Sequence, residues 1–273
     1  MTPTVDANGA RIPLIGLGTW DLRGKTCARM VEEALALGYR HIDTAAMYGN
    51  EEAVGAGLKA SGISRDEVFV TTKVWYEDLA PADLRRSAEA SLNRLGLSRV
   101  DLLLIHWPNA RIPLAGSVRA LCEVKRAGLA HHVGVANFTV RLLDEAVAAA
   151  DEPIAANQCE YHPYLDQRAV LSACRRHGVA FISYCPLGKA QVLGEPAIEA
   201  IATAHGRTPA QIVLRWHLQQ GVAAIPKSGN ARRIAENFAV FDFDLAEDEM
   251  ARISKLARPG GRMVAPSWSP AWD

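Results

Sequence analysis

The chain has 273 residues, which suits one large domain or a single α/β barrel. Hydrophobic residues make up 49% and charged residues 22% of the sequence, and the formal net charge is zero, so no overall field favours nucleic acid or anionic lipid. Five cysteines without a close C-x-x-C pair indicate reduced thiols, and neither a signal peptide nor an apolar run of roughly 18 residues occurs. We therefore expect a cytoplasmic protein that binds neither nucleic acid nor a membrane.

The predicted elements alternate regularly along the chain. The first 18 residues read as a hairpin of two short strands that turn at Asn8-Gly9. Strands are then predicted at residues 39–43, 67–73, 99–106, 131–136, 154–158, 179–184 and 222–226. Helices are predicted at residues 25–37, 50–60, 81–95, 115–127, 139–150, 166–177, 195–205 and 208–219, with a last helix from about residue 230. Pro81 opens one of these helices, and Gly38 and Gly96 end two of them.

The predicted strands are short and apolar on both faces, as a parallel sheet covered by helices on both sides requires. About eight βα units follow one another without a linker, and no G-x-G-x-x-G motif follows the first strand. These features favour a closed (β/α)8 TIM barrel over an open doubly wound sheet. We expect one domain over residues 1–273, in which the N-terminal hairpin and extra helices are added to the barrel.

Polar side chains stand where the predicted strands end. They are Asp43, Lys73, His106, Asn137, Gln158, Tyr184 and Lys227. Each one alone has a structural explanation, because a lone histidine is often hydrogen-bonded core and an asparagine at a strand end often caps the next helix. Seven such residues in register, with Tyr48 five positions after Asp43, instead indicate one site at the carboxyl ends of the barrel strands.

The motifs at these strand ends are specific and extend over nearly the whole chain. They include Gly16-Leu17-Gly18-Thr19, residues 43–51, Leu104-Ile105-His106-Trp107-Pro108, Gly134-Val135-Ala136-Asn137-Phe138, Tyr184-Cys185-Pro186-Leu187-Gly188 and Ile225-Pro226-Lys227-Ser228. In this order they resemble the aldo-keto reductase family. The short C-terminus, Pro270-Ala271-Trp272-Asp273, is most similar to the bacterial 2,5-diketo-D-gluconate reductases of the B type. The resemblance implies an NADP(H)-dependent reductase of aldehydes and ketones.

The resemblance also implies a catalytic tetrad of Asp43, Tyr48, Lys73 and His106. Hydride addition builds negative charge on a carbonyl oxygen, so the site needs a proton donor and groups that stabilise the charge. Tyr48 would be the general acid, and we expect the Lys73 ammonium, held by Asp43, to lower the pKa of its phenol. His106 would orient the carbonyl oxygen as a neutral donor.

The family holds NADP(H) in an extended pose across the barrel mouth. The resemblance implies that Asn137 and Gln158 hold the carboxamide, that Tyr184 stacks on the nicotinamide, and that Leu187 and Gly188 line the pyrophosphate path. The remaining cofactor-binding residues would be Thr19, Trp20 and Asp43, with Lys227, Ser228 and Arg233 at the 2′-phosphate and Glu236 and Asn237 at the adenine. Two cations and a hydroxyl suit a dianion and favour NADP over NAD. The alternative is a surface ion pair between Arg233 and Glu236.

One residue departs from the family pattern. Ala136 stands where the family has a serine before Asn137. The missing hydroxyl removes one hydrogen bond to the carboxamide, a loss of about 0.5 to 1.5 kcal/mol. We expect this change to weaken nicotinamide binding without abolishing it.

The resemblance places four tryptophans, Trp20, Trp75, Trp107 and Trp268, as walls of a pocket for a small-molecule carbonyl substrate. Alternatively, such rings pack under loops. Residues 258–273 resemble the C-terminal loop of the family over the active site, which makes Arg262 and Trp272 further specificity candidates. Residues 188–194 form a short loop expected to fold over the pyrophosphate. No metal site is expected, because adjacent His131 and His132 point to opposite faces of a strand.

Two other functions remain open from the sequence. Channel β-subunits share this fold, so the chain could be an NADP-binding regulatory subunit without physiological turnover, although no long accessory region is present. Lys73 could also form a Schiff base as in aldolases, but pairing with Asp43 would keep its amine protonated. We expect a monomeric reductase in preference to both.

Overall fold

The computed structural model describes residues 2–273, and its central sheet has eight parallel strands that follow one another in chain order. They are β3 (Leu17–Gly18), β4 (His41–Asp43), β5 (Phe69–Val74), β6 (Val100–Ile105), β7 (Ala130–Ala136), β8 (Ile154–Glu160), β9 (Ala180–Tyr184) and β10 (Ala223–Ala224). The edges of the sheet meet, because the Gly16 N–H donates to the Ala224 carbonyl at 2.9 Å and the Gly18 N–H to that of Pro226 at 3.2 Å. The predicted closed (β/α)8 barrel is therefore confirmed.

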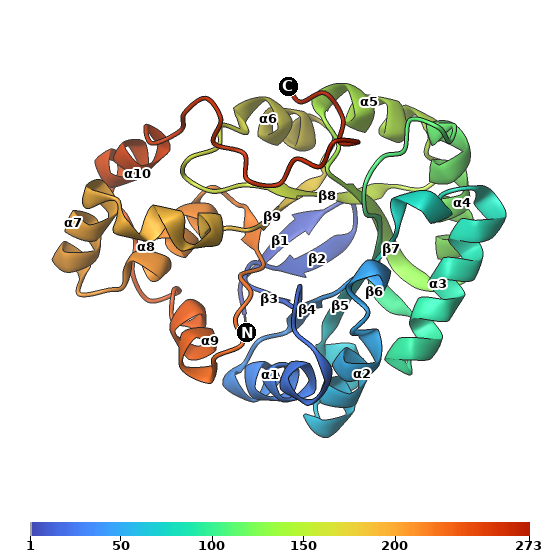
Figure 1. Ribbon diagram of the computed structural model, residues 1–273, viewed down its shortest axis with the longest axis horizontal. Helices are drawn as coiled ribbons and strands as arrows, with labels where there is room; N and C mark the ends of the chain where they lie inside the picture. The colour runs from blue at the N-terminus through green and yellow to red at the C-terminus, as the bar shows by residue number, and fades with distance from the viewer. Residues whose placement is uncertain (1) are drawn as a thin grey trace.

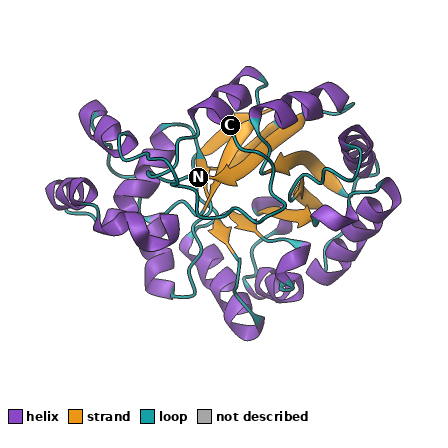
Figure 2. Ribbon diagram, turned by 45° about the horizontal axis from the view of Figure 1, so that its top comes forward, coloured by secondary structure: helices purple, strands orange, loops and turns teal. Residues whose placement is uncertain are grey.

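Helices surround the strands, as Figures 1 and 2 show, and eight of them follow the strands in chain order. They are α1 (Gly24–Leu37), α2 (Glu51–Ala60), α3 (Pro81–Leu95), α4 (Leu114–Arg126), α5 (Val140–Ala149), α6 (Arg168–Arg176), α8 (Pro209–Gln219) and α9 (Ala231–Phe238). Gly38 and Gly96 end α1 and α3 in the left-handed conformation, with φ of 111° and 66°, as predicted. No helix within residues 2–273 is long and apolar enough to cross a bilayer.

Two further helices, α7 (Pro196–His205) and α10 (Glu247–Ser254), pack beside each other at the left of Figure 1. The sequence reading anticipated α7 but treated the chain after residue 230 as one helix. The structure ends α9 at Phe238 and starts α10 nine residues later, where the Glu249 carboxylate accepts the N–H of Ala246 at 2.8 Å. Residues 188–194, expected as a loop, form the 3-10 segment η4 (Gly188–Gly194), which is broken by a kink at Lys189 and Ala190, where φ is 50° and 68°.

The predicted hairpin is β1 (Thr4–Ala7) paired antiparallel with β2 (Ala10–Pro13). Asn8 and Gly9 both have positive φ, 45° and 86°, as a two-residue turn that matches the strand twist requires. The Asn8 amide donates to the carbonyl of Ile154, the first residue of β8, at 2.7 Å. The hairpin therefore covers the end of the barrel opposite the carboxyl ends of the strands.

Two layers of apolar side chains fill the fold. Inside the barrel, Ile12 of the hairpin is buried with Leu104, Ala136 and Ala156. Between strands and helices lies a larger cluster that includes Ile42, Val70, Leu103, Val133, Leu121 and Leu143. Gly134 is required in β7, because a Cβ there would lie 2.5 Å from the Ala156 carbonyl oxygen of β8. These two packed layers fix the direction in which the end of each strand points.

Candidate active site

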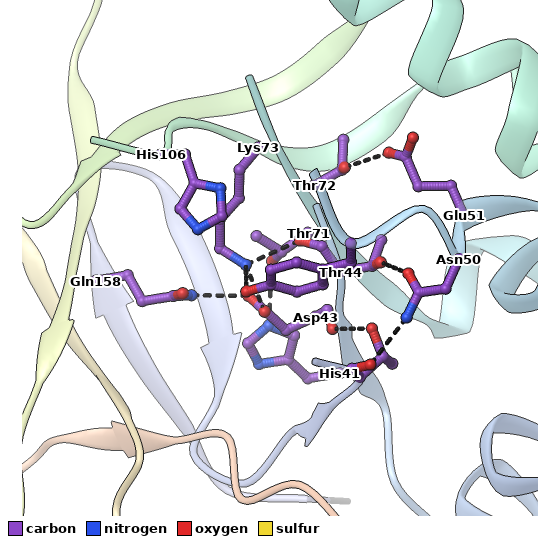
Figure 3. A network of polar contacts seen from close by, with 12 residues as sticks. His41, Asp43, Thr44, Asn50, Glu51, Thr71, Thr72, Lys73, His106 and Gln158 are labelled. Carbon is purple, nitrogen blue, oxygen red and sulfur yellow. Dashed lines mark hydrogen bonds and ion pairs between the residues drawn. The ribbon is translucent and has the colours of Figure 1, made fainter. Parts of the chain in front are cut away.

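The four residues predicted as a tetrad lie together at the carboxyl ends of β4, β5 and β6. The Lys73 Nζ is 2.5 Å from the Asp43 Oδ1 and 3.4 Å from the Tyr48 hydroxyl. The rings of Tyr48 and His106 meet edge to face with centroids 5.6 Å apart. Tyr48 is carried by the 3-10 turn η1 (Ala46–Tyr48) after β4. Figure 3 shows Asp43, Lys73 and His106 converging with Gln158 from β8.

The Lys73 ammonium has an acceptor for each of its three N–H groups. Besides Asp43 and Tyr48, it donates to the carbonyl of Thr44 at 2.8 Å. The second Asp43 oxygen accepts from the Gln158 amide at 2.7 Å. Lys73 and Asp43 are 0% and 1% exposed, so both charges are held away from solvent and neutralise each other. Such a pair is stable only when its remaining hydrogen bonds are satisfied, as they are here.

The pKa of Tyr48 shifts in the direction opposite to the one expected from the sequence. Burial, and then the Asp43 carboxylate, raise the pKa of Tyr48 well above 10. The expectation that Lys73 would lower it is wrong for this structure, because Asp43 offsets the field of the ammonium and solvent is excluded. Burial also lowers the pKa of Lys73, which Asp43 opposes. Tyr48 therefore keeps its proton at neutral pH.

His106 stays uncharged in the same site, as expected. Burial, and then the Lys73 ammonium, hold the pKa of His106 well below 6.5. Its Nδ1 is buried and has no hydrogen-bond partner among residues 2–273. The backbone carbonyl of His106 accepts from the Asn137 amide at 3.0 Å, which fixes the loop that carries the ring. A neutral imidazole beside a protonated phenol presents donors to an oxygen atom.

Glu51, whose role the sequence reading missed, ties the Tyr48 turn to the Lys73 strand. It is the first residue of α2, is 1% exposed, and accepts from the Thr72 hydroxyl at 2.5 Å and from the Arg94 guanidinium at 2.7 Å. Glu51 was part of the motif at residues 43–51 but was read only as a helix start. A charged residue at a buried helix start, next to a polar strand end, was the available signal.

Asn50 makes a second link on the same side. Its carbonyl oxygen accepts from the Thr44 hydroxyl at 2.7 Å, and its amide donates to the carbonyl of Thr19 at 2.8 Å. Thr19 in turn donates from its hydroxyl to the Asp43 carbonyl at 2.9 Å. The loop after β3, which carries predicted site residues Thr19 and Trp20, is thereby held against β4.

The predicted nicotinamide residues also come together. Asn137 follows β7 with a φ of 64°, and its side-chain oxygen accepts from the Tyr184 hydroxyl at 2.7 Å. The Asn137 backbone N–H donates to the Gln158 carbonyl at 2.9 Å. Gly188 follows Leu187 and starts η4, where a Cβ would lie 2.9 Å from Val192. The structure thus brings Asn137, Gln158 and Tyr184 to one side of the tetrad.

The predicted 2′-phosphate residues lie around the start of α9. Lys227 and Arg233 are exposed, and neither forms an ion pair within the described part of the chain. Ser228 is buried, with its hydroxyl 3.1 Å from the Asn230 N–H. The alternative pair of Arg233 with Glu236 does not form among the described residues, and Glu236 instead accepts from the Thr208 hydroxyl at 2.8 Å. Asn237 is buried on the same helix. Two cations without carboxylate partners fit a phosphate group.

Aromatic rings surround Tyr48 and His106. The Trp20 ring lies 4.9 Å from that of Tyr48, and the Trp75 ring lies 5.2 Å from that of His106, both edge to face. Trp268 stacks on Tyr76, with ring centroids 4.2 Å apart. Tyr76 was not singled out from the sequence. Trp268 also touches Trp107 and Trp75, with centroids 5.2 and 5.7 Å away. Trp20 and Trp268 are 50% and 39% exposed, so they do not simply pack under loops.

The C-terminal tail, residues 258–273, crosses the barrel mouth as expected and carries Trp268 to this cluster (Figure 1, red). Arg262 and Trp272, the other two specificity candidates, contact each other, with the guanidinium carbon 3.6 Å from the ring centroid. The tail therefore forms one side of the aromatic cluster.

Comparison with known proteins gives consistent matches over the chain. The model of the Aldo/keto reductase family matches residues 14–258. Methylglyoxal reductase DkgB of Yersinia pestis is 41% identical over 266 residues, which cover 96% of this chain and 99% of the relative. Morphine 6-dehydrogenase of Pseudomonas putida is 42% identical over 266 residues, 91% of this chain and 89% of the relative.

Solved structures match equally well. A structure provisionally described as a 2,5-diketo-D-gluconic acid reductase B has a TM-score of 0.98 and 45% identity, and the match covers 100% of this chain and 98% of that one. A Bombyx mori aldo-keto reductase in complex with NADP has a TM-score of 0.91 and 31% identity, over 98% of this chain and 96% of that one.

Proposed function

The chain belongs to the aldo/keto reductase family, and we propose that it is an NADPH-dependent reductase that converts aldehydes and ketones to alcohols. Glyoxals, keto esters and 2,5-diketo-D-gluconate are the candidate substrates, and the first and the last of these are in keeping with the names of relatives. One arrangement carries the proposal: the Tyr48 hydroxyl, whose pKa is raised, lies 3.4 Å from the Lys73 Nζ, and the Tyr48 ring meets the neutral His106 ring edge to face.

The residues suit the proton transfer that carbonyl reduction requires. Reduced nicotinamide supplies the hydride when it is bound. Tyr48 donates its hydroxyl proton to the carbonyl oxygen, and the Lys73 ammonium 3.4 Å away stabilises the phenolate that forms. Asp43 keeps that ammonium in place, and His106 donates a hydrogen bond that orients the carbonyl. General acid catalysis of this kind contributes about 10²- to 10⁴-fold.

The cofactor proposal rests on the free cations near α9. A 2′-phosphate dianion would be bound by Lys227, Ser228 and Arg233, and the exposed side chains of Lys227 and Arg233 are available for it. The rest of the cofactor would contact Thr19, Trp20, Asp43, Asn137, Gln158, Tyr184, Leu187, Gly188, Glu236 and Asn237. These assignments favour NADP(H) over NAD(H), because NAD lacks the group that the cations suit.

The Lys73 contacts and the presence of all four tetrad residues bear on the alternative functions. All three N–H groups of Lys73 are directed at acceptors and the residue is 0% exposed, so no lone pair of its amine faces a substrate as an aldolase would need. A regulatory subunit without turnover would bind NADPH but would not require a complete Asp43, Tyr48, Lys73 and His106 constellation.

We propose in addition that the protein is a cytoplasmic monomer and one domain over residues 1–273. Its five cysteines are unpaired, and four of them are buried, which suits a reducing compartment. Size-exclusion chromatography with light scattering tests the monomer, and a dimer mass would overturn it.

The first experiment is loss of NADPH absorbance with a panel of glyoxals, aryl aldehydes, keto esters and 2,5-diketo-D-gluconate. Tyr48→Phe should lower kcat about 10²- to 10⁴-fold without weakening NADPH binding. Tyr76→Phe is the matched control, because its ring packs in the same cluster but its hydroxyl lies outside the tetrad. Tight NADPH binding without turnover of any member would overturn the reductase and support the regulatory subunit.

A second experiment tests the cofactor choice. Arg233→Ala should weaken NADPH binding about 10- to 100-fold and leave NADH binding unchanged, because only the 2′-phosphate loses a charge-assisted hydrogen bond. Arg232→Ala removes the same charge one position earlier on α9 and serves as the control. Equal losses for NADPH and NADH would contradict the assignment of Arg233.

A further inference from the structure

Glu160, at the end of β8, holds a fully buried carboxylate that the proposed mechanism does not use. The residue is 0% exposed. Its Oε1 accepts the N–H of Met263 at 2.6 Å, and its Oε2 accepts the N–H of Val264 at 2.9 Å. The Nε2 of His162, also 0% exposed, lies 2.9 Å from Oε1. A buried charge persists only when it is hydrogen-bonded, and here the C-terminal tail supplies two of the three contacts.

The carboxylate supplies hydrogen-bond acceptors that the tail lacks, because residues 261–266 belong to no helix or strand. The Met263 and Val264 N–H groups have no place in a backbone ladder and are satisfied by Glu160 instead. The Met263 carbonyl accepts from the Lys189 ammonium at 3.1 Å, so this residue is held on both sides. The tail also lies close to the chain after β8, where a Cβ on Gly261 would be 1.9 Å from the Tyr164 carbonyl.

This anchor is close in sequence to the aromatic cluster. Trp268, which stacks on Tyr76 and touches Trp75 and Trp107, is four residues after Val264. Four residues span at most about 14 Å when fully extended. Fixing Val264 therefore holds Trp268 within that distance of the Glu160 carboxylate's partner, on the side of the barrel mouth where its ring meets Tyr76 and Trp107.

We propose that Glu160 is a positioning residue for substrate binding: its carboxylate anchors the tail and so places Trp268 as one wall of the pocket. The assignment of a pocket rests on the proposed reductase function, whereas the anchor rests on the contacts alone. Glu160→Gln replaces one acceptor oxygen by an N–H₂ group. This donor would then face a backbone N–H of the tail, which is also a donor. The tail then loses at least one of its two charge-assisted hydrogen bonds.

The test compares variants on both sides of the contact. Glu160→Gln and Val264→Pro, which removes the N–H from the tail side, should each increase amide exchange of residues 262–268. Both should raise KM for an aryl aldehyde about tenfold, while kcat and NADPH affinity stay within about twofold. Val264→Ala keeps the N–H and should change neither quantity. Glu249→Gln is the matched control, because Glu249 also accepts from a histidine and a backbone N–H but lies in α10.

A Trp268→Ala background separates positioning from a general structural role. In that background Glu160→Gln should raise KM no further, because the wall it positions is already absent. A protected tail and an unchanged KM in Glu160→Gln would overturn the proposal, as would an equal KM increase with and without Trp268. If Glu160→Gln does not fold, Val264→Pro carries the same test. The two proposals can also fail separately. If the wild type reduces no carbonyl but amide exchange of the tail is still faster in these variants, the anchor is supported and the reductase function is refuted.

Discussion

Replacing Lys73 with methionine removes one charge from a pair that is buried from solvent. Methionine has nearly the length of lysine, so the loss is mainly electrostatic. The Asp43 carboxylate, 1% exposed, then keeps the Gln158 amide at 2.7 Å but loses the ammonium at 2.5 Å. The Thr44 carbonyl also loses its donor. We expect a large loss of stability, because a buried carboxylate is left without a counter-charge.

The expected size follows from the burial of both groups. Removing one partner of a buried pair costs about 3 to 5 kcal/mol. In a chain of 273 residues this lowers Tm by roughly 6 to 10 °C. Asp43→Asn in the same background removes the isolated charge, and its amide oxygen still accepts from Gln158. The double variant should therefore regain about 2 kcal/mol or more relative to Lys73→Met alone.

Urea unfolding of the wild type, both single variants and the double variant measures this coupling. Activity does not discriminate among the variants, because each of them disrupts the proposed tetrad. Losses that add within about 0.5 kcal/mol would refute the reasoning, since independent sites behave in this way. Such a result would mean that Lys73 and Asp43 are each solvated well enough to stand alone.

Two further predictions concern the cofactor and pH. Ala136→Ser supplies the hydroxyl that the family has before Asn137, and should tighten NADPH binding about two- to tenfold; an unchanged or weaker dissociation constant in a fluorescence titration would contradict the placement of the nicotinamide. Burial lowers the pKa of His217 from 6.5 to about 4, although both ring nitrogens face carbonyl oxygens, those of Val213 and Tyr161. Below pH 6.5 the unfolded chain takes up a proton that the folded chain does not, so stability falls by up to about 3 kcal/mol toward pH 4. His217→Gln should make stability depend less on pH between pH 6.5 and 4, as measured by urea midpoints. The same pH dependence in the variant and the wild type would contradict the assignment to His217.

The sequence alone determined which residues reach the barrel mouth. Asp43, Lys73 and His106 each stand at the end of an apolar run, and in a closed parallel sheet every strand ends on the same side. Position along the chain therefore decides position in space for these residues. The hairpin turn at Asn8-Gly9 was predictable for a similar reason, because its conformation depends on two adjacent residues.

Tertiary structure decided the properties that depend on distance and solvent. The pKa of Tyr48 rises because its phenol is buried and lies near the Asp43 carboxylate, and no spacing in the sequence measures that burial. The contacts of Glu160 with Met263 and Val264 join residues 103 and 104 positions apart. A backbone N–H carries no side-chain signal, so the partner of a buried carboxylate becomes visible only when the folded chain brings the tail across the barrel.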